Sequence, residues 1–165
     1  MPNERELEAK FWKALKSDMT AMLGLAGGRE SLAQPMTAQL GEREGRGPIW
    51  FFTSKETDLV RALGGGAPAM LHFASKDHEL FASLEGRLAP DDDPAVIDRL
   101  WNRFVAAWFQ EGRDDPKLQL IRFDAERAQI WLNENSLFAG VKMLLGADPK
   151  QDYKDKVAEV EMGTS

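Results

Sequence analysis

The chain has 165 residues, of which 43% are hydrophobic and 29% are charged, and its formal net charge is -6. These values are close to those of soluble globular proteins, and they exclude an intrinsically disordered chain. The length predicts a single domain over residues 1–165, and the scattered basic residues exclude a nucleic-acid-binding protein, because affinity for the phosphate backbone requires several lysines and arginines on one face.

Membrane-spanning and disulfide-linked proteins are excluded as well. No run of about 18 apolar residues is present, so no membrane-spanning helix and no membrane partner are expected. The first residues lack the basic-then-apolar pattern of a secretory signal, which predicts a cytoplasmic location. The chain has no cysteine, so disulfides, thiolate metal ligands and cysteine nucleophiles are excluded, and any redox chemistry would require a bound cofactor.

The N-terminal part predicts a helix followed by a hairpin. Asn3 and Glu6 have the spacing of a capping box, and one helical face then carries Leu7, Phe11, Ala14 and Leu15. Residues 19–25 and 32–40 form short apolar segments around a glycine-rich loop, which predicts two strands of a hairpin. Because Pro35 lacks a backbone N–H, the second strand is expected to have an edge, a bulge or a ligand there.

Residues 49–53 are the strongest strand signal, because each is β-branched or aromatic. A strand that is apolar on both faces predicts burial on both faces, by protein or by ligand. Residues 53–56 have the spacing of a second capping box, and Leu59, Val60 and Leu63 continue at helical spacing up to the glycines at 64–66. This pattern predicts a corner where a strand passes directly into a helix.

The second half predicts strands at residues 69–73 and 80–88, with helical spacing from Pro94 to Trp108 after an Asp93 cap. Residues 118–123 and 128–132 predict a final hairpin, and the charged tail at 152–162 predicts a frayed helix or a mobile end. Many short strands with helices at the corners favour a mainly β chain, folded as a small, partly open antiparallel barrel.

No combination of nucleophile, base and orienting group is apparent in the sequence. His72 is most simply a hydrogen-bonded sheet residue, and His78 an exposed turn residue. The acidic run at residues 91–93 precedes Pro94, where carboxylates favour the positive end of a helix dipole. These residues therefore predict structural roles and no metal site.

The corner after residue 52 is a better candidate for a binding site. Backbone groups of Trp50, Phe51 and Phe52 could meet a flat ring, and the hydroxyls of Thr53 and Ser54 with unpaired N–H groups of the following helix could meet an anion. Together they would suit a phosphorylated aromatic cofactor. The alternative is an aromatic core strand followed by an ordinary helix cap.

Several segments closely resemble the general stress protein subgroup of the pyridoxamine 5'-phosphate oxidase-like, flavin-binding split-barrel family. The similarity extends from about Leu7 to Trp131, and it depends on the order and spacing of residues 34–39 (QPMTAQ), residues 49–53 (IWFFT), Leu100-Trp101, residues 107–109 (AWF), Gly112 and residues 115–118 (DPKL).

The resemblance implies an antiparallel, Greek-key-like split β-barrel that forms a homodimer, with FMN, or alternatively FAD, at two sites lined by both chains. By position, the isoalloxazine would lie along Met36, Thr37 and Ala38, with main-chain contacts and a wall from Trp50, Phe51 and Phe52. Thr53 and Ser54 would face the phosphate, and Trp108 would line the site. The protein would orient the ring and tune it, because electron transfer is the flavin's own chemistry.

The chain departs from the family at its basic positions. Gln34 replaces an Arg that commonly precedes the Pro-Met pair, and Asp58 and Leu59 stand where the oxidases have phosphate-binding basic residues. Phosphate contacts from charged groups are roughly twice as strong as neutral ones, so FMN binding would be weakened unless Lys55 or a basic residue of the partner chain substitutes. Pyridoxamine phosphate oxidase activity is therefore not expected.

Three functions remain open from the sequence. The first is a flavin-binding protein with flavin-dependent oxidoreductase activity. The second is a non-catalytic stress protein that binds a flavin or another small ligand. The third is a dimeric barrel that has lost its cofactor, as the identities of Gln34, Asp58 and Leu59 would allow.

Overall fold

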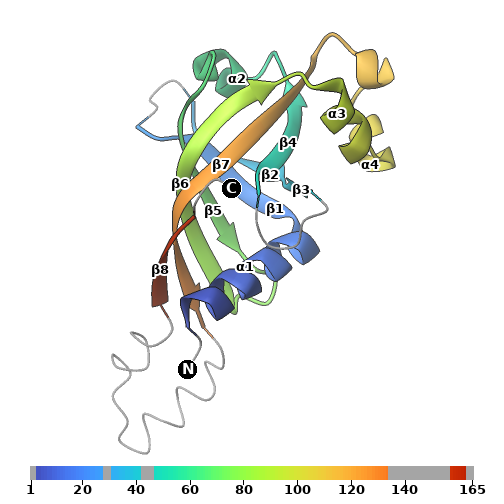
Figure 1. Cartoon of the computed structure of the whole chain (residues 1–165). Helices are drawn as coiled ribbons and strands as arrows, with labels where there is room; N and C mark the ends of the chain where they lie inside the picture. Colours follow the sequence, from blue (N-terminus) through green and yellow to red (C-terminus); the bar gives the residue numbers. More distant parts are fainter. Residues whose placement is uncertain (1–2, 28–30, 42–46, 134–156, 163–165) are drawn as a thin grey trace, which may run out of the picture.

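A single antiparallel sheet curls into a nearly closed barrel in the computed structural model, which describes residues 3–27, 31–41, 47–133 and 157–162 (Figure 1). The strand order is β2-β1-β5-β6-β7-β4-β3, and β8 pairs with β7. The strands are β1 (Thr20–Leu25), β2 (Gln34–Thr37), β3 (Gln39–Leu40), β4 (Ile49–Ser54), β5 (Ala67–Ala74), β6 (Leu80–Asp91), β7 (Leu118–Leu132) and β8 (Val157–Glu161). The predicted mainly β, partly open antiparallel barrel is thus confirmed.

One segment of the chain forms both edges of this sheet. β2 pairs only with β1, whereas β3, one residue further on, pairs with β4 at the opposite edge. Between them Ala38 is buried, and its N–H donates to the carbonyl of Met19 at 2.6 Å. The predicted hairpin is confirmed, and Pro35 lies on an edge strand, where its missing N–H leaves no ladder partner unpaired.

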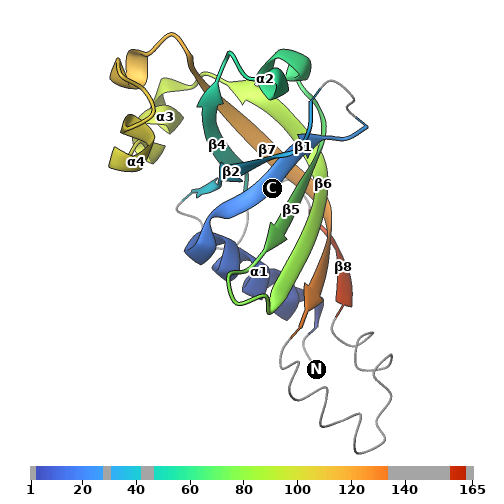
Figure 2. The same ribbon diagram turned by 180° about the vertical axis from the view of Figure 1, so that it is seen from behind.

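Helix α1 (Glu4–Asp18) lies across one end of the barrel, as Figures 1 and 2 show from opposite sides. The Asn3–Glu6 capping box is confirmed, because each side chain accepts a hydrogen bond from the other residue's backbone N–H. Phe11 is fully buried and meets Phe73 of β5 edge to face, with ring centroids 5.9 Å apart. Among the described helices, none is long and apolar enough to cross a membrane.

Strand β4 is buried on both faces by the protein itself. Ile49 and Phe51 enter the barrel core, and Phe51 is 0% exposed. On the outer face Trp50 is 4% exposed, because Val96 and Leu100 of α3 (Pro94–Leu100) pack over it. The two-sided apolar pattern is therefore explained at these positions by packed side chains, and no ligand is needed to account for it.

The strand-to-helix corner begins later than the sequence predicts. The capping box at residues 53–56 is wrong, because β4 continues through Ser54, which still pairs with Leu118 of β7. Helix α2 (Asp58–Leu63) begins after Thr57, whose hydroxyl oxygen accepts the N–H of Val60 at 3.3 Å. Consequently Glu56 lies outside the helix.

The predicted helix over residues 94–108 is interrupted. The Asp93 cap is confirmed, since its side chain accepts the N–H of Ala95 at 3.0 Å. At Asn102, however, the side chain accepts hydrogen bonds from the N–H groups of both Phe104 and Val105 at 3.0 Å, which starts a new helix, α4 (Arg103–Ala106). The chain is extended at Trp101 and Asn102, and the second cap begins a separate helix there.

The final predicted hairpin is also wrong, because β7 is one continuous strand of 15 residues. Its pairing with β6 shifts register between Glu85 and Gly86, so Glu126 is accommodated as a bulge and the strand needs no turn. Strand β8 replaces the predicted C-terminal helix: Val160 and Met162 are buried in the core, and residues 152–156 of that prediction lie outside the described residues.

Candidate functional site

A pocket of about 350 Å³ opens between the edge strand β2, the end of β4 and the short helix α4. Figure 1 shows α3 and α4 beside β4 at one side of the barrel. The lining residues are Gln34, Pro35, Met36, Thr37, Gln39, Phe52, Thr53, Ser54, Phe104, Val105, Trp108 and Phe109. The pocket therefore lies beside the segment that forms both edges of the barrel.

The apolar part of the lining comes mainly from β4 and the α4 region. Val105 and Phe109 are buried and pack with Leu118 of β7. Phe52 is half-buried and meets Trp101 edge to face, with ring centroids 5.9 Å apart. In contrast, Phe104 and Trp108 are 69% and 81% exposed. The pocket thus has firmly packed aromatic and aliphatic walls and two exposed aromatic side chains.

The polar part of the lining is neutral. It consists of side chains from β2, β3 and the end of β4: Gln34, Thr37, Gln39, Thr53 and Ser54. These amides and hydroxyls can both donate and accept hydrogen bonds. None of the described residues that line the pocket is charged or titrates near neutral pH, so the site can orient a ligand, but these side chains offer no proton acceptor for catalysis.

The corner after β4 is already hydrogen-bonded to the protein. The N–H of Lys55 donates to the carbonyl of Lys117 at 2.8 Å, the N–H of Glu56 to the Ser54 hydroxyl at 3.1 Å, and the N–H of Thr57 to the Ser54 carbonyl at 3.1 Å. The N–H groups of residues 55–57 are therefore taken up by the protein, and the N-terminus of the helix, where unpaired N–H groups were expected, lies further on at Asp58. Because α2 is only six residues long, its dipole also offers little to an anion.

The structure brings together seven of the candidate residues predicted from the sequence. These are Gln34, Met36, Thr37, Phe52, Thr53, Ser54 and Trp108, which all line the pocket. Ala38, Trp50, Phe51 and Leu59 do not line it, because their side chains are buried in the protein. Lys55 and Asp58 are exposed and also lie outside the lining.

Sequence reasoning missed five lining residues: Pro35, Gln39, Phe104, Val105 and Phe109. Pro35 and Gln39 are next to predicted site residues on the segment that forms β2 and β3. The others share a helical spacing with Trp108, at positions i, i+1, i+4 and i+5, which could have identified one face directed to the site. From the sequence alone this spacing predicts one long amphipathic helix, because nothing but the Asn102 cap marks the break between α3 and α4.

The two histidines lie away from the pocket. The Nδ1 atom of His72 is 3.1 Å from the Ser83 hydroxyl on the neighbouring strand, which confirms a hydrogen-bonded sheet histidine. His78 is exposed in the β5–β6 turn and stacks on Phe81, with ring centroids 6.3 Å apart. Within the described ranges, no group of three or more His, Asp or Glu side chains could hold a metal ion.

Comparison with known proteins gives one matching family model, described as "Pyridoxamine 5'-phosphate oxidase like", over residues 6–154. Among solved structures, a general stress family protein from Xanthomonas campestris pv. campestris is 58% identical (TM-score 0.76) over 82% of this chain and 93% of its own. The general stress FMN/FAD binding protein from Xanthomonas citri is 57% identical (TM-score 0.75) over 80% and 92%. A general stress protein 26 from Jannaschia sp. CCS1 is 28% identical (TM-score 0.79) over 96% and 99%. No curated protein matches the chain.

Proposed function

Because this chain belongs to the pyridoxamine 5'-phosphate oxidase-like family, we propose that it is a flavin-binding protein of the general stress type, which holds FMN or FAD in the pocket between β2, β4 and α4. The observation that supports this function most directly is the pocket, whose lining combines aromatic walls with neutral hydrogen-bonding groups. The relative from Xanthomonas citri, 57% identical, is described as an FMN/FAD binding protein.

The residues of the pocket fit a flavin ring. An isoalloxazine is flat and apolar on its faces and has neutral heteroatoms along its edge. Phe52, Met36 and Trp108 would contact its faces, and Gln34 and Thr37 would hydrogen-bond to its edge. A bound flavin supplies hydride and electron transfer by its own chemistry.

The part of this chain would be to bind the ring, orient it and shield it from water. Since the pocket lining provides no titratable group, any oxidoreductase activity would rely on the flavin and on an external electron donor. Oxidation of pyridoxamine phosphate lies outside this function, because the phosphate of that substrate would also need basic side chains that the lining does not provide.

We expect the purified protein to take up FMN or FAD, with quenching of flavin fluorescence and a shifted visible absorption band. Replacing Trp108 with alanine should weaken flavin binding about tenfold, because stacking on an aromatic side chain is worth about 1–3 kcal/mol. Phe81→Ala removes an exposed aromatic ring outside the pocket and should change the dissociation constant less than about twofold. A colourless protein that binds neither added flavin would contradict the function.

The same function includes a homodimer in which each flavin is lined by both chains. The family resemblance implies it, and the exposure of Phe104 and Trp108 beside the pocket supports it, because neighbouring exposed aromatic side chains commonly mark an interaction surface. Sedimentation equilibrium at micromolar concentration should give about twice the mass of one chain. A monomer under these conditions would overturn the shared site. Flavin binding itself is tested separately, by the titration described above.

A further inference from the structure

Two exposed aromatic rings form the open side of the pocket. Phe104 and Trp108 line it and are nevertheless 69% and 81% exposed, so each ring reaches from the pocket to solvent. In contrast, Val105 and Phe109 of the same segment are buried against Leu118. The rings of Phe104 and Trp108 therefore border the mouth of the pocket, where a second molecule can meet a ligand already bound inside.

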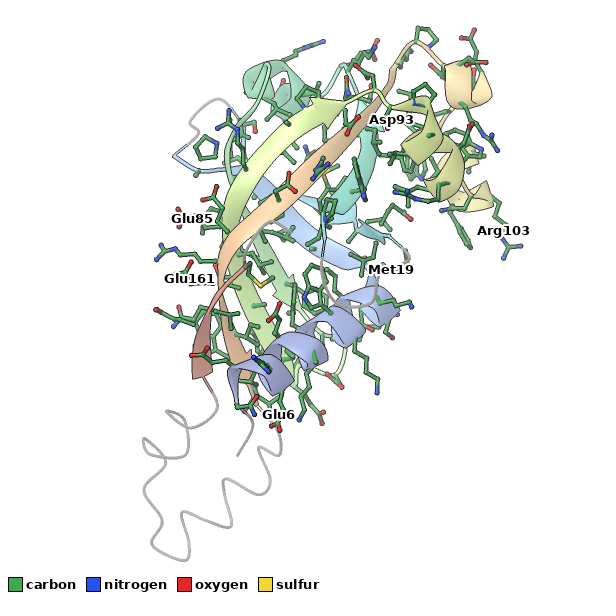
Figure 3. The ribbon with its side chains drawn as sticks, in the orientation of Figure 1. Glu6, Met19, Glu85, Asp93, Arg103 and Glu161 are labelled. Carbon is green, nitrogen blue, oxygen red and sulfur yellow. The ribbon has the colours of Figure 1, made fainter. Side chains whose placement is uncertain are left out.

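A cation lies directly beside this mouth. The guanidinium of Arg103 lies over the Phe104 ring, 4.9 Å from its centroid, and the side chain extends outward from α4 (Figure 3). A guanidinium that stacks on an aromatic ring keeps its in-plane N–H donors free to bind a carboxylate. Arg103 and Phe104 thus offer an aromatic face and an anion-binding group side by side.

The charge of Arg103 is not neutralised within the part of the chain that the structure describes. Arg103 forms no ion pair there, whereas Arg113, after the same helix, pairs with Asp98 at 2.8 Å. One guanidinium matches one carboxylate in charge and in its two parallel hydrogen bonds. A phosphate ester carries nearly two negative charges at neutral pH, so a single arginine would leave part of its charge unpaired. The mouth is therefore best suited to a carboxylate.

A second cation lies on a different wall of the pocket. Lys55 is exposed and directly follows the lining residue Ser54 at the end of β4, whereas Arg103 lies on α4. The tip of β4 lies between α2 and α4 in both views of the ribbon (Figures 1 and 2). A flavin tail at the β4 wall would leave Arg103 to another molecule. Because the exposed rings belong to the α4 wall, Arg103 is the cation that an aromatic molecule at the mouth would meet.

We propose that Arg103 selects the second ligand of this site, and that this ligand is a flat aromatic carboxylate admitted beside the bound flavin. The inference rests on the proposed flavin-binding function and names the class of substrate that the same site admits. The ring of the ligand would lie against Phe104, and its carboxylate would bind the guanidinium of Arg103. In the proposed homodimer the second chain also borders the mouth, so the test includes the oligomeric state.

The test is a calorimetric titration of the flavin-loaded chain with benzoate, benzamide and phenyl phosphate. Benzoate and benzamide have nearly the same shape, so the ratio of their dissociation constants isolates the charge. We expect benzoate to bind about tenfold more tightly than benzamide, because a hydrogen bond between charged groups is worth about this factor, and the advantage should fall in high salt. An advantage of less than about threefold, no binding of benzoate, or tighter binding of phenyl phosphate than of benzoate would overturn the inference.

Variants of Arg103 test whether this side chain is the cause. Arg103→Gln removes the charge and should reduce the preference for benzoate over benzamide to less than about twofold. Arg103→Lys keeps the charge without the planar fork and should retain about threefold. Arg99→Gln is the matched control, because Arg99 is exposed on α3 and its replacement changes the net charge equally. It should leave the preference intact, and an equal loss in both glutamine variants would overturn the inference.

Two further measurements separate the possible failures. Visible absorption shows first whether flavin is bound, and a chain that takes up no flavin would overturn the proposed function and this inference with it. Sedimentation equilibrium of Arg103→Gln shows whether the side chain instead pairs with an acidic residue of a second copy. A monomeric variant that retains the preference for benzoate would overturn the inference while leaving flavin binding in place.

Discussion

Replacing Gly86 with alanine is expected to lower the free energy of unfolding by about 3 kcal/mol. Gly86 lies in β6 where the pairing with β7 shifts register. An added Cβ would be pressed against the carbonyl oxygen of Asp124 and would lie 2.9 Å from the Cα of Ala125. Both neighbours are backbone atoms of the longest strand, so neither can move without disturbing the ladder.

Gly65→Ala is the matched control for this variant. Nothing lies within 4 Å of a Cβ at Gly65, and its backbone is outside the left-handed region. Its replacement should therefore leave the free energy of unfolding unchanged or raise it by up to about 1 kcal/mol, because alanine lowers the conformational entropy of the unfolded chain. Urea unfolding followed by tryptophan fluorescence compares the two, and equal midpoints would mean that the bulge does not depend on a glycine.

Replacing Leu59 with lysine is expected to lower the free energy of unfolding by about 4 kcal/mol, whereas Asp58→Lys, one residue earlier, should change it by less than about 1 kcal/mol. Leu59 is 0% exposed in the barrel core. Its variant would lose apolar packing and bury an ammonium group. Asp58 is exposed at the first position of α2, so its variant loses only a favourable interaction with the helix dipole.

Chemical denaturation of the two lysine variants under identical conditions provides the comparison. If Leu59→Lys unfolded at the same denaturant concentration as the original chain, Leu59 could not be packed as the structure has it. The pair also bears on the alternative of a barrel that has lost its cofactor. A basic residue cannot be placed at position 59 without disrupting the core, so Gln34 is the better position at which to introduce a positive charge.

The location of the pocket follows from the way the barrel closes. Within residues 34–40, β2 pairs with β1 and forms one edge of the sheet, and β3 pairs with β4 and forms the other. Ala38 is buried between the two strands. An edge strand has a neighbouring strand on one side only, so its other side is open. Gln34, Thr37 and Gln39 therefore remain available to line a pocket, while the same segment holds the two edges together.

Several short-range features were predicted correctly from the sequence, although the capping box at residues 53–56 was not. The capping box of Asn3 and Glu6, the cap at Asp93 and the hairpin of β1 and β2 are confirmed, and of the three alternatives for Pro35 the structure shows the edge strand. Each depends on groups a few residues apart or on a backbone N–H that proline does not have. Seven of the pocket residues were also identified, because they lie on three short segments of unusual residue order, at 34–37, at 52–54 and at Trp108.

Long-range features were decided only by the tertiary structure. Residues 118–132 form one strand because Gly86, some forty residues earlier, admits a bulge, and the C-terminal segment is a strand because β7 offers it an edge. Likewise, Trp50 is shielded from solvent on the outer face of β4 because α3 covers it. Local sequence carries the preferences of caps and turns, but pairing partners and covering elements come from distant residues. The sequence therefore determined the barrel and the segments of the site, and packing alone decided which of their side chains face the pocket.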